Sequence, residues 1–246
     1  MLHAGSQVGR GCAKALSPAL LRLGGTSGDY GWYNVLPDEA GPPFNNPPFP
    51  VPTYKFNATA YSLLAEYAAD AGWDFVIGAN AALRTPANVW NSTNFETLLK
   101  FSREQSGRGI FGWELSNEPD LFPEHNFTVP ADQLARDFTV LASLVGTASN
   151  HSLIIGPDIA DKASYLQTWC ETLVKLHAQS VVDRVTWHHY YGNSASFTLN
   201  DFVSPQVRTW MHDPGKLLGI PVLWASGFAK SSSPREATYD PIFRSV

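Results

Sequence analysis

A carboxyl group stands at the end of a predicted buried strand near the middle of the chain. The segment Phe111-Gly-Trp-Glu-Leu-Ser-Asn117-Glu118-Pro119 is largely apolar until Asn117, and Pro119 then directs the backbone out of a sheet. A carboxyl group that is partly buried among aromatic side chains has a raised pKa and can donate a proton to a leaving oxygen, as glycosidic bond cleavage requires. The amide of Asn117 can hydrogen-bond a sugar hydroxyl. The alternative interpretation is a solvated glutamate that precedes a helix.

A second group of polar side chains lies on another predicted strand, Val185-Thr-Trp-His188-His189-Tyr190-Tyr191. Because side chains alternate between the two faces of a strand, His188 and Tyr190 share one face. The adjacent His188 and His189 point opposite ways, and no further ligand cluster accompanies them, so we expect no metal site. We expect His188 and Tyr190 to orient a carbohydrate in a cleft. An aromatic strand that serves packing alone is the alternative.

Parallel strands are needed to bring these residues together. Short apolar runs that end in Gly, Asn, Asp or His alternate along the chain with longer segments whose apolar residues recur every three to four positions. This alternation predicts parallel strands joined by crossover helices, which is an α/β fold. The expected strands are 19–24, 74–80, 110–116, 152–156, 184–190 and 220–225, and the expected helices are 60–71, 94–106, 130–147 and 163–180.

The strand ends distinguish between two α/β architectures. Six strands would suit an open doubly wound sheet, whereas a (β/α)8 barrel needs eight. However, the segment 24–28 after the first strand lacks the glycine-rich phosphate-binding patterns of nucleotide-binding sheets. Polar residues instead gather at the ends of several strands, as they do at the catalytic face of a barrel. These residues are Thr26, Asn80, Asn117, Asp158 and His188. We therefore predict an incomplete (β/α)8 TIM-type barrel with about six of its eight strands.

The composition of the 246-residue chain excludes several classes of protein. Hydrophobic residues make up 44% and charged residues 16%, which is typical of a globular chain and excludes a disordered chain or a long coiled coil. A net charge of −5 argues against a protein that binds nucleic acid through a basic face. No apolar run approaches the roughly 20 residues that cross a bilayer, so we expect no transmembrane segment.

Cysteines and sequons bear on the compartment. We expect Cys12 and Cys170 to be two buried thiols, with one long-range disulfide as the alternative. Four Asn-X-Ser/Thr sequons are acceptors for N-glycosylation if the chain enters the secretory pathway. They begin at Asn57, Asn91, Asn126 and Asn150. Against export, residues 1–14 lack the apolar segment of a signal peptide.

Five blocks of the sequence resemble, in the same order, those of the heparanase-like glycosidases, glycoside hydrolase family 79. The blocks are Leu16 to Asp29, Gly78 to Arg84, Trp113 to Pro119, Gly156 to Asp158 and Val185 to Tyr191. The resemblance implies a retaining β-glucuronidase on a (β/α)8 barrel with an appended β-sandwich. It implies a uronic-acid-containing polysaccharide or proteoglycan as the substrate, no cofactor, and an extracellular, cell-surface or lysosomal location.

The resemblance also implies roles for individual residues. Glu118 matches the general acid/base of the family, and Asn117 matches its neighbour that contacts the sugar 2-hydroxyl. Four further residues match positions at the barrel mouth that bind the substrate or hold the nucleophile. These are Thr26, Asn80, His188 and Tyr190.

One catalytic group of the family has no match at its expected place. The nucleophile normally ends the strand that corresponds to Pro221–Ala225, yet the chain continues as Ser226-Gly-Phe-Ala-Lys230 without a carboxylate. Retaining hydrolysis needs a second carboxylate about 5 to 5.5 Å from the acid. We therefore expect an impaired glycosidase, with a non-catalytic carbohydrate-binding pseudoenzyme or a barrel fragment without independent function as alternatives. The eighth strand and the β-sandwich are also unmatched, so we expect a partial barrel over 1–227 and an irregular tail over 228–246.

Overall fold

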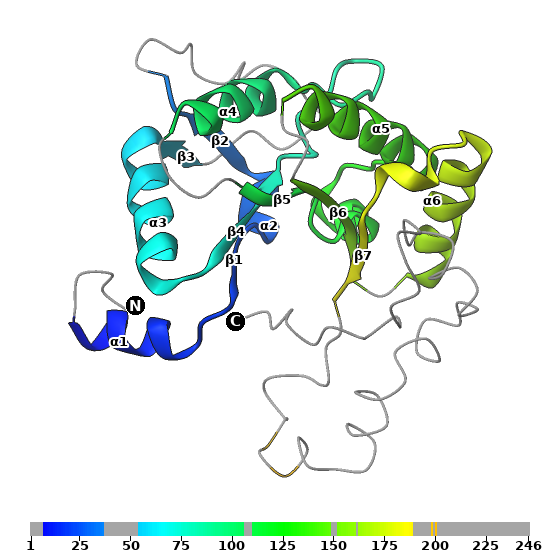
Figure 1. The fold of residues 1–246 in the computed structure, drawn as a ribbon. Helices are drawn as coiled ribbons and strands as arrows, with labels where there is room; N and C mark the ends of the chain where they lie inside the picture. The colour runs from blue at the N-terminus through cyan, green and yellow to red at the C-terminus, as the bar shows by residue number, and fades with distance from the viewer. Residues whose placement is uncertain are drawn as a thin grey trace.

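A curved sheet of five parallel strands forms the centre of the structure (Figure 1). The computed structural model describes residues 7–36, 54–105, 110–148, 152–160, 162–188, 198 and 200. The strand order is β1-β4-β5-β6-β7, and every neighbouring pair is parallel. The strands are β1 (Leu20–Leu23), β4 (Asp74–Ala79), β5 (Ile110–Leu115), β6 (Leu153–Ile159) and β7 (Arg184–Trp187). This parallel half-barrel confirms the predicted α/β fold and five of the six predicted strands.

Helices connect these strands and cover one side of the sheet, as Figure 1 shows. They are α3 (Ala58–Ala71), α4 (Thr93–Glu104), α5 (Ala131–Ala148) and α6 (Ala163–Lys175), and the further helix α1 (Gln7–Ala15) packs against α3. Asn57 caps α3 by accepting the Ala60 N–H at 2.9 Å, and Gly72 ends the helix in the left-handed conformation that glycine tolerates. The predicted helix 163–180 is too long, because His177 has a φ of 54° and interrupts the helical backbone after Lys175.

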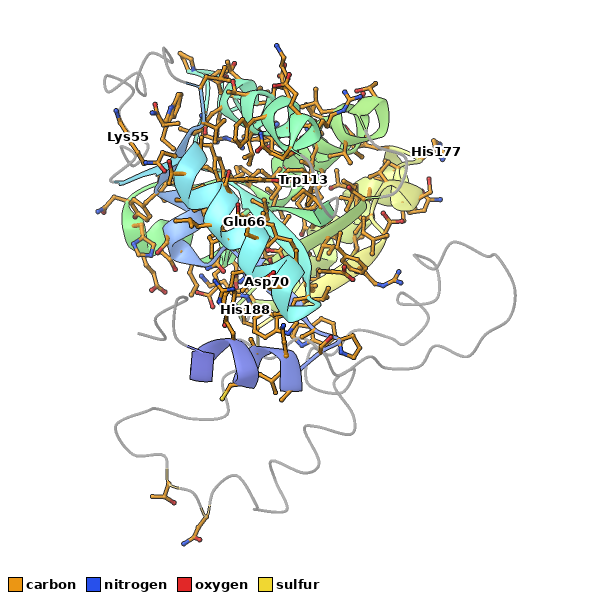
Figure 2. All side chains as sticks on the ribbon, turned by 60° about the vertical axis from the view of Figure 1, so that its left-hand side comes forward. Lys55, Glu66, Asp70, Trp113, His177 and His188 are labelled. Atoms are coloured by element: carbon orange, nitrogen blue, oxygen red, sulfur yellow. The ribbon has the colours of Figure 1, made fainter. Side chains whose placement is uncertain are left out.

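The hydrophobic core lies between the sheet and the helices. Trp113 of β5 is 1% exposed and lies in the interior in Figure 2, whereas Glu66 and Asp70 of α3 are exposed. The ring of Phe95 on α4 meets Trp113 edge-on, with centroids 5.1 Å apart. Such aromatic pairs add about 0.5–1.5 kcal/mol to the free energy gained by burying their area. The core therefore fixes the strand whose end carries Glu118.

Shorter elements surround the carboxyl ends of the strands. They are α2 (Thr26–Asp29), β2 (Gly31–Asn34), β3 (Tyr54–Asn57) and the 3₁₀ helix η1 (Pro119–His125), whereas the 3₁₀ helix η2 (Gln179–Val181) directly precedes β7 at its amino end. The sequence did not predict the parallel pair β2–β3. Asn94 of α4 holds β2 in place, since its amide accepts the Tyr33 N–H at 3.0 Å and donates to the Tyr33 carbonyl at 2.8 Å.

Several sequence predictions fall outside the described residues. These are the strand 220–225, the tail 228–246, the Asn150 sequon and Tyr190. The expectation of two buried thiols is wrong for Cys12, which is exposed on α1, while Cys170 is buried, and both cysteines are free. None of the helices in the described part of the chain is long and apolar enough to cross a membrane.

Candidate functional site

Glu118 stands directly beyond β5, in a backbone conformation that few residues adopt. Its φ and ψ are 50° and 51°, in the left-handed region, and its N–H donates to the Asp158 carbonyl at 2.8 Å. The Glu118 side chain is 15% exposed, and its Oε1 lies 2.7 Å from Nδ1 of His188, at the end of β7. The structure therefore brings together two predicted site residues that are 70 positions apart in the sequence.

Asn117 is held from three directions beside Glu118. Its N–H donates to Oδ2 of Asp29 at 2.9 Å, and its side-chain oxygen accepts from Nη2 of Arg22 at 3.3 Å. Its side-chain nitrogen lies 3.5 Å from Oγ1 of Thr26, so three predicted site residues, Thr26, Asn117 and Glu118, gather at one place. The amide group of Asn117 consequently has a fixed orientation, with its N–H groups on the side of Thr26.

Asn80, the remaining described residue of the predicted site, is 3% exposed and serves the backbone. Its Nδ2 donates to the Gly31 carbonyl at 2.8 Å, and its Oδ1 accepts the Ala82 N–H at 2.8 Å. The Asn80 carbonyl in turn accepts from the indole of Trp90 at 3.0 Å. Asn80 thus fixes the loop after β4 against the start of β2.

A buried cluster of charges lies beneath Asn117 and Glu118. Arg22 of β1 contacts Glu114 of β5, with Nε and Oε2 2.6 Å apart, and Asp158 of β6, with Nη2 and Oδ2 2.8 Å apart. The Glu114 side chain is 1% exposed and the Asp158 side chain 5%. One guanidinium group therefore ties together three strands, and two carboxylates share its positive charge.

Burial and mutual repulsion change the pKa values of these groups. Burial raises the pKa of Glu114 well above its usual range, and the nearby Asp158 carboxylate adds to the rise. Burial alone would lower the pKa of Arg22, but Asp158 and Glu114 outweigh it and raise that pKa. Burial also raises the pKa of Asp29 to about 8, although two backbone N–H donors and Arg22 oppose the rise. Burial thus opposes the charged form of Glu114 and of Asp29 beneath the site.

The surface at this place is a shallow pocket with polar and aromatic walls. Asn117 and Glu118 line one part, and the side chains of η1, among them His125, line another. Phe122 and Phe127, which also line the pocket, stack with their ring centroids 4.4 Å apart. A carboxyl group, an amide and a nearby imidazole suit proton transfer to or from a bound hydroxyl or ether oxygen. Among the described residues, no group of three His, Cys, Asp or Glu side chains is placed to hold a metal ion.

Sequence reasoning assigned no role to Arg22, Asp29 or Glu114. Arg22 and Glu114 each interrupt an apolar strand, and a charged residue within a run that is otherwise buried signals an interior partner of opposite charge. Asp29 gave no comparable signal, because an aspartate next to Gly28 is also typical of an exposed turn.

The chain is similar to a group of known carbohydrate-active proteins. Residues 6–205 match the family model described as "Glycosyl hydrolase family 79, N-terminal domain". Heparanase from Gallus gallus is 30% identical over an alignment of 252 positions, which covers 85% of this chain and 47% of the relative. "Inactive heparanase-2" from Mus musculus is 32% identical over 160 residues, which cover 63% of this chain and 26% of the relative. The chain therefore spans less than half the length of these relatives.

Among solved structures, a glucosidase from Croceicoccus marinus superposes with a TM-score of 0.56. The match covers 89% of this chain and 46% of the glucosidase, at 15% identity. At this identity the likeness concerns the fold alone. It agrees with the parallel half-barrel seen here.

Proposed function

Because the chain belongs to glycosyl hydrolase family 79, we propose that it carries the proton-donating part of a heparanase-like glycosidase site, with Glu118 as the general acid/base. The observation that carries the proposal is the position of Glu118 between Asn117 and His188, with Oε1 2.7 Å from the imidazole Nδ1. The proposed substrate is a uronic-acid-containing polysaccharide or proteoglycan chain. Relatives that are named heparanase support this choice over a small glycoside.

In the proposed reaction, the protonated carboxyl of Glu118 donates its proton to the glycosidic oxygen as the bond to the anomeric carbon breaks. The carboxylate that remains accepts a hydrogen bond from Nδ1–H of His188. Asn117, whose oxygen is already bonded to Arg22, offers its N–H to the hydroxyl next to the anomeric carbon. Thr26 lies on the same side and contacts the same amide. Asn80 acts through the loop it holds, and Tyr190 is proposed for the barrel mouth only by its match to the family.

We further propose that hydrolysis is impaired in this chain. Residues 226–230, which follow the strand expected to carry the nucleophile, contain no carboxylate. Without a second carboxylate, the covalent glycosyl-enzyme of a retaining enzyme cannot form. The second candidate function is therefore carbohydrate binding without hydrolysis. The relative named "Inactive heparanase-2" supports this candidate.

An external nucleophile tests the role of Glu118 despite the missing carboxylate. We expect the purified chain to turn over phenyl β-glucuronide only when sodium azide is added: azide attacks the anomeric carbon, the phenol leaves with the proton of Glu118, and an α-glucuronyl azide forms. Glu118→Gln should lower the azide-dependent rate by at least about 100-fold, within the usual contribution of a general acid. The matched control is Glu124→Gln, which makes the same change on the exposed surface of η1. Equal rates in the two variants would disprove the proposed role.

Ligand binding separates the two candidate functions. A glucuronide that binds only the folded chain raises its melting temperature. A rise without any azide-dependent turnover favours the binding protein. Turnover without azide that Glu118→Gln abolishes would overturn the proposed impairment, because a nucleophile would then be present. Neither a rise nor turnover would favour a fragment without independent function.

We propose an extracellular, cell-surface or lysosomal location. We also propose that the chain is N-glycosylated on its way there. Asn57 and Asn126, which begin two of the sequons, are exposed. We also propose that residues 1–227 form a partial barrel and that residues 228–246 are an irregular tail.

A further inference from the structure

Asp29 connects the ends of two strands that carry site residues. It is the last residue of α2, it is 2% exposed, and each of its carboxyl oxygens accepts one backbone N–H. Oδ2 accepts from Asn117 at 2.9 Å, and Oδ1 accepts from Ala81 at 3.1 Å. The first donor directly precedes Glu118, and the second directly follows Asn80. One side chain therefore bridges the loops after β4 and β5.

The bridge begins where direct bonding between the strands weakens. The Ser116 N–H reaches the Ala79 carbonyl at 3.3 Å, the last backbone bond between the two strand ends that the structure gives. Beyond that point the backbone N–H groups of Ala81 and Asn117 bond to Asp29 instead of to the neighbouring chain. Asp29 thus links the two diverging loops through hydrogen bonds, as backbone hydrogen bonds link the two strands.

The backbone around Asn117 needs such a constraint. Ser116 has a φ of 83° and Glu118 a φ of 50°, so two left-handed residues that are not glycine flank Asn117. Such a conformation is strained for residues other than glycine and persists only when the surroundings determine it. Asp29 holds the middle of this segment and the Asp158 carbonyl holds the Glu118 N–H at 2.8 Å. These two bonds fix the direction in which the Glu118 side chain leaves the backbone.

We propose that Asp29 is a positioning residue for proton donation by Glu118. The inference rests on the proposed function of Glu118 and adds a residue that does not touch the reacting atoms. An asparagine at position 29 has one acceptor oxygen, so it keeps at most one of the two backbone bonds and turns an NH₂ group toward the other N–H. The segment then relaxes, and a shift of about 1 Å is sufficient to lower a rate by about 100-fold.

The test compares two leaving groups in the azide-dependent reaction. Phenol needs a proton to leave, whereas 2,4-dinitrophenol leaves without one, so a displaced acid slows only the phenyl glucuronide. We expect Asp29→Asn to lower the phenyl glucuronide rate at least about tenfold and the dinitrophenyl glucuronide rate less than about twofold. The control is Asp183→Asn, because Asp183 also accepts a backbone N–H, from Ile154 at 2.9 Å, but at the opposite end of the sheet. Should Asp29→Asn not fold, Asp29→Ser, whose hydroxyl can accept one N–H, takes its place.

Each outcome decides the matter. A selective loss on the phenyl glucuronide in the Asp29 variant, absent from Asp183→Asn, supports the inference. Equal losses on both glucuronides overturn it, because Asp29 then has only a structural role. Wild-type turnover that Glu118→Gln does not reduce overturns the proposed function first, and the inference with it. If the wild-type chain shows no azide-dependent turnover, the proposed role of Glu118 and the inference on Asp29 are likewise overturned.

Discussion

Arg22 of β1 and Glu114 of β5 form an ion pair across the strand that separates them, with Nε and Oε2 2.6 Å apart. The intervening strand, β4, carries Gly78 next to the pair, where an added Cβ would lie 3.8 Å from Glu114 Oε2. Directly after β1, a Cβ at Gly24 would lie 3.1 Å from the central carbon of the guanidinium group of Arg22. Because Gly78 and Gly24 have no side chains, they leave room for the side chains of Arg22 and Glu114.

Removal of Arg22 should be strongly destabilising. Arg22→Met leaves Glu114 and Asp158 buried without their cation, and breaking a buried pair in this way costs about 3–5 kcal/mol. Urea denaturation of the purified chain measures this loss. The control is Arg10→Met, which removes an ion pair with Asp70 whose side chains are 53% exposed, and exposed pairs contribute about 0–1 kcal/mol. Similar losses in both variants would contradict the importance of the buried cluster.

A methyl group at Gly24 should press on the same cluster. Gly24→Ala places its Cβ against the guanidinium of Arg22, and such overpacking costs about 1–3 kcal/mol. Gly11→Ala is the matched control on α1, because nothing lies within 4 Å of its added Cβ. Alanine is the better helix former there, so we expect a gain of up to about 1 kcal/mol. Thermal unfolding should therefore move the two melting temperatures in opposite directions.

Stability should depend on the proton held by Asp29. Burial raises its pKa to about 8 in the folded chain, whereas the unfolded chain keeps the ordinary value near 3.8. Below about pH 4 both states bind the proton and the stabilisation is complete. Between about pH 4 and 8 only the folded state binds it, so the free energy of unfolding falls as the pH rises.

Urea denaturation at pH 5 and pH 8 measures this decline. Glu114, whose pKa is also raised by burial, adds to the decline in the same direction. Asp29→Asn removes the contribution of Asp29, so the decline should become smaller in that variant. An unchanged difference between pH 5 and pH 8 would show that Asp29 binds no extra proton in the folded state.

The sequon at Asn126 offers a test of the compartment. Asn126 and Thr128 are both exposed, so this sequon is open to modification. We expect Thr128→Ala, expressed behind a secretory leader in eukaryotic cells, to lose the mass of one N-glycan. This change leaves Asn126 in place, whose φ of 64° suits asparagine. Thr147→Ala, at an exposed threonine outside any sequon, should keep the full mass, and equal masses in the two variants would contradict glycosylation at Asn126.

The sequence alone predicted the five strands of the large sheet and the proposed general acid, Glu118. It did not predict the buried ion pairs that hold these strands together. Strand β5 was predictable because its apolar run ends sharply at Asn117 and Glu118. The partners of Arg22 were not, because Glu114 and Asp158 are 92 and 136 positions away and only the curvature of the sheet brings them together. Strands β2 and β3 are four residues each and pair with each other across a long connection, so neither shows a pattern of its own. The early end of α6 depends on a left-handed His177, which no helix propensity reveals.

The 136 positions between Arg22 and Asp158 also set the order in which the molecule can assemble. A chain that leaves the ribosome from its N-terminus presents Arg22 and Glu114 well before Asp158 and His188 exist. Contacts of such large sequence separation are slow to form, because the intervening chain must first lose its conformational freedom. Among the described strands, β7 is the last to leave the ribosome, and it brings His188 to Glu118, so the proposed proton donor can acquire its imidazole partner only after the other four strands of the described sheet have been synthesised. A chain that stops before this strand has a carboxyl group at the tip of β5 without that partner.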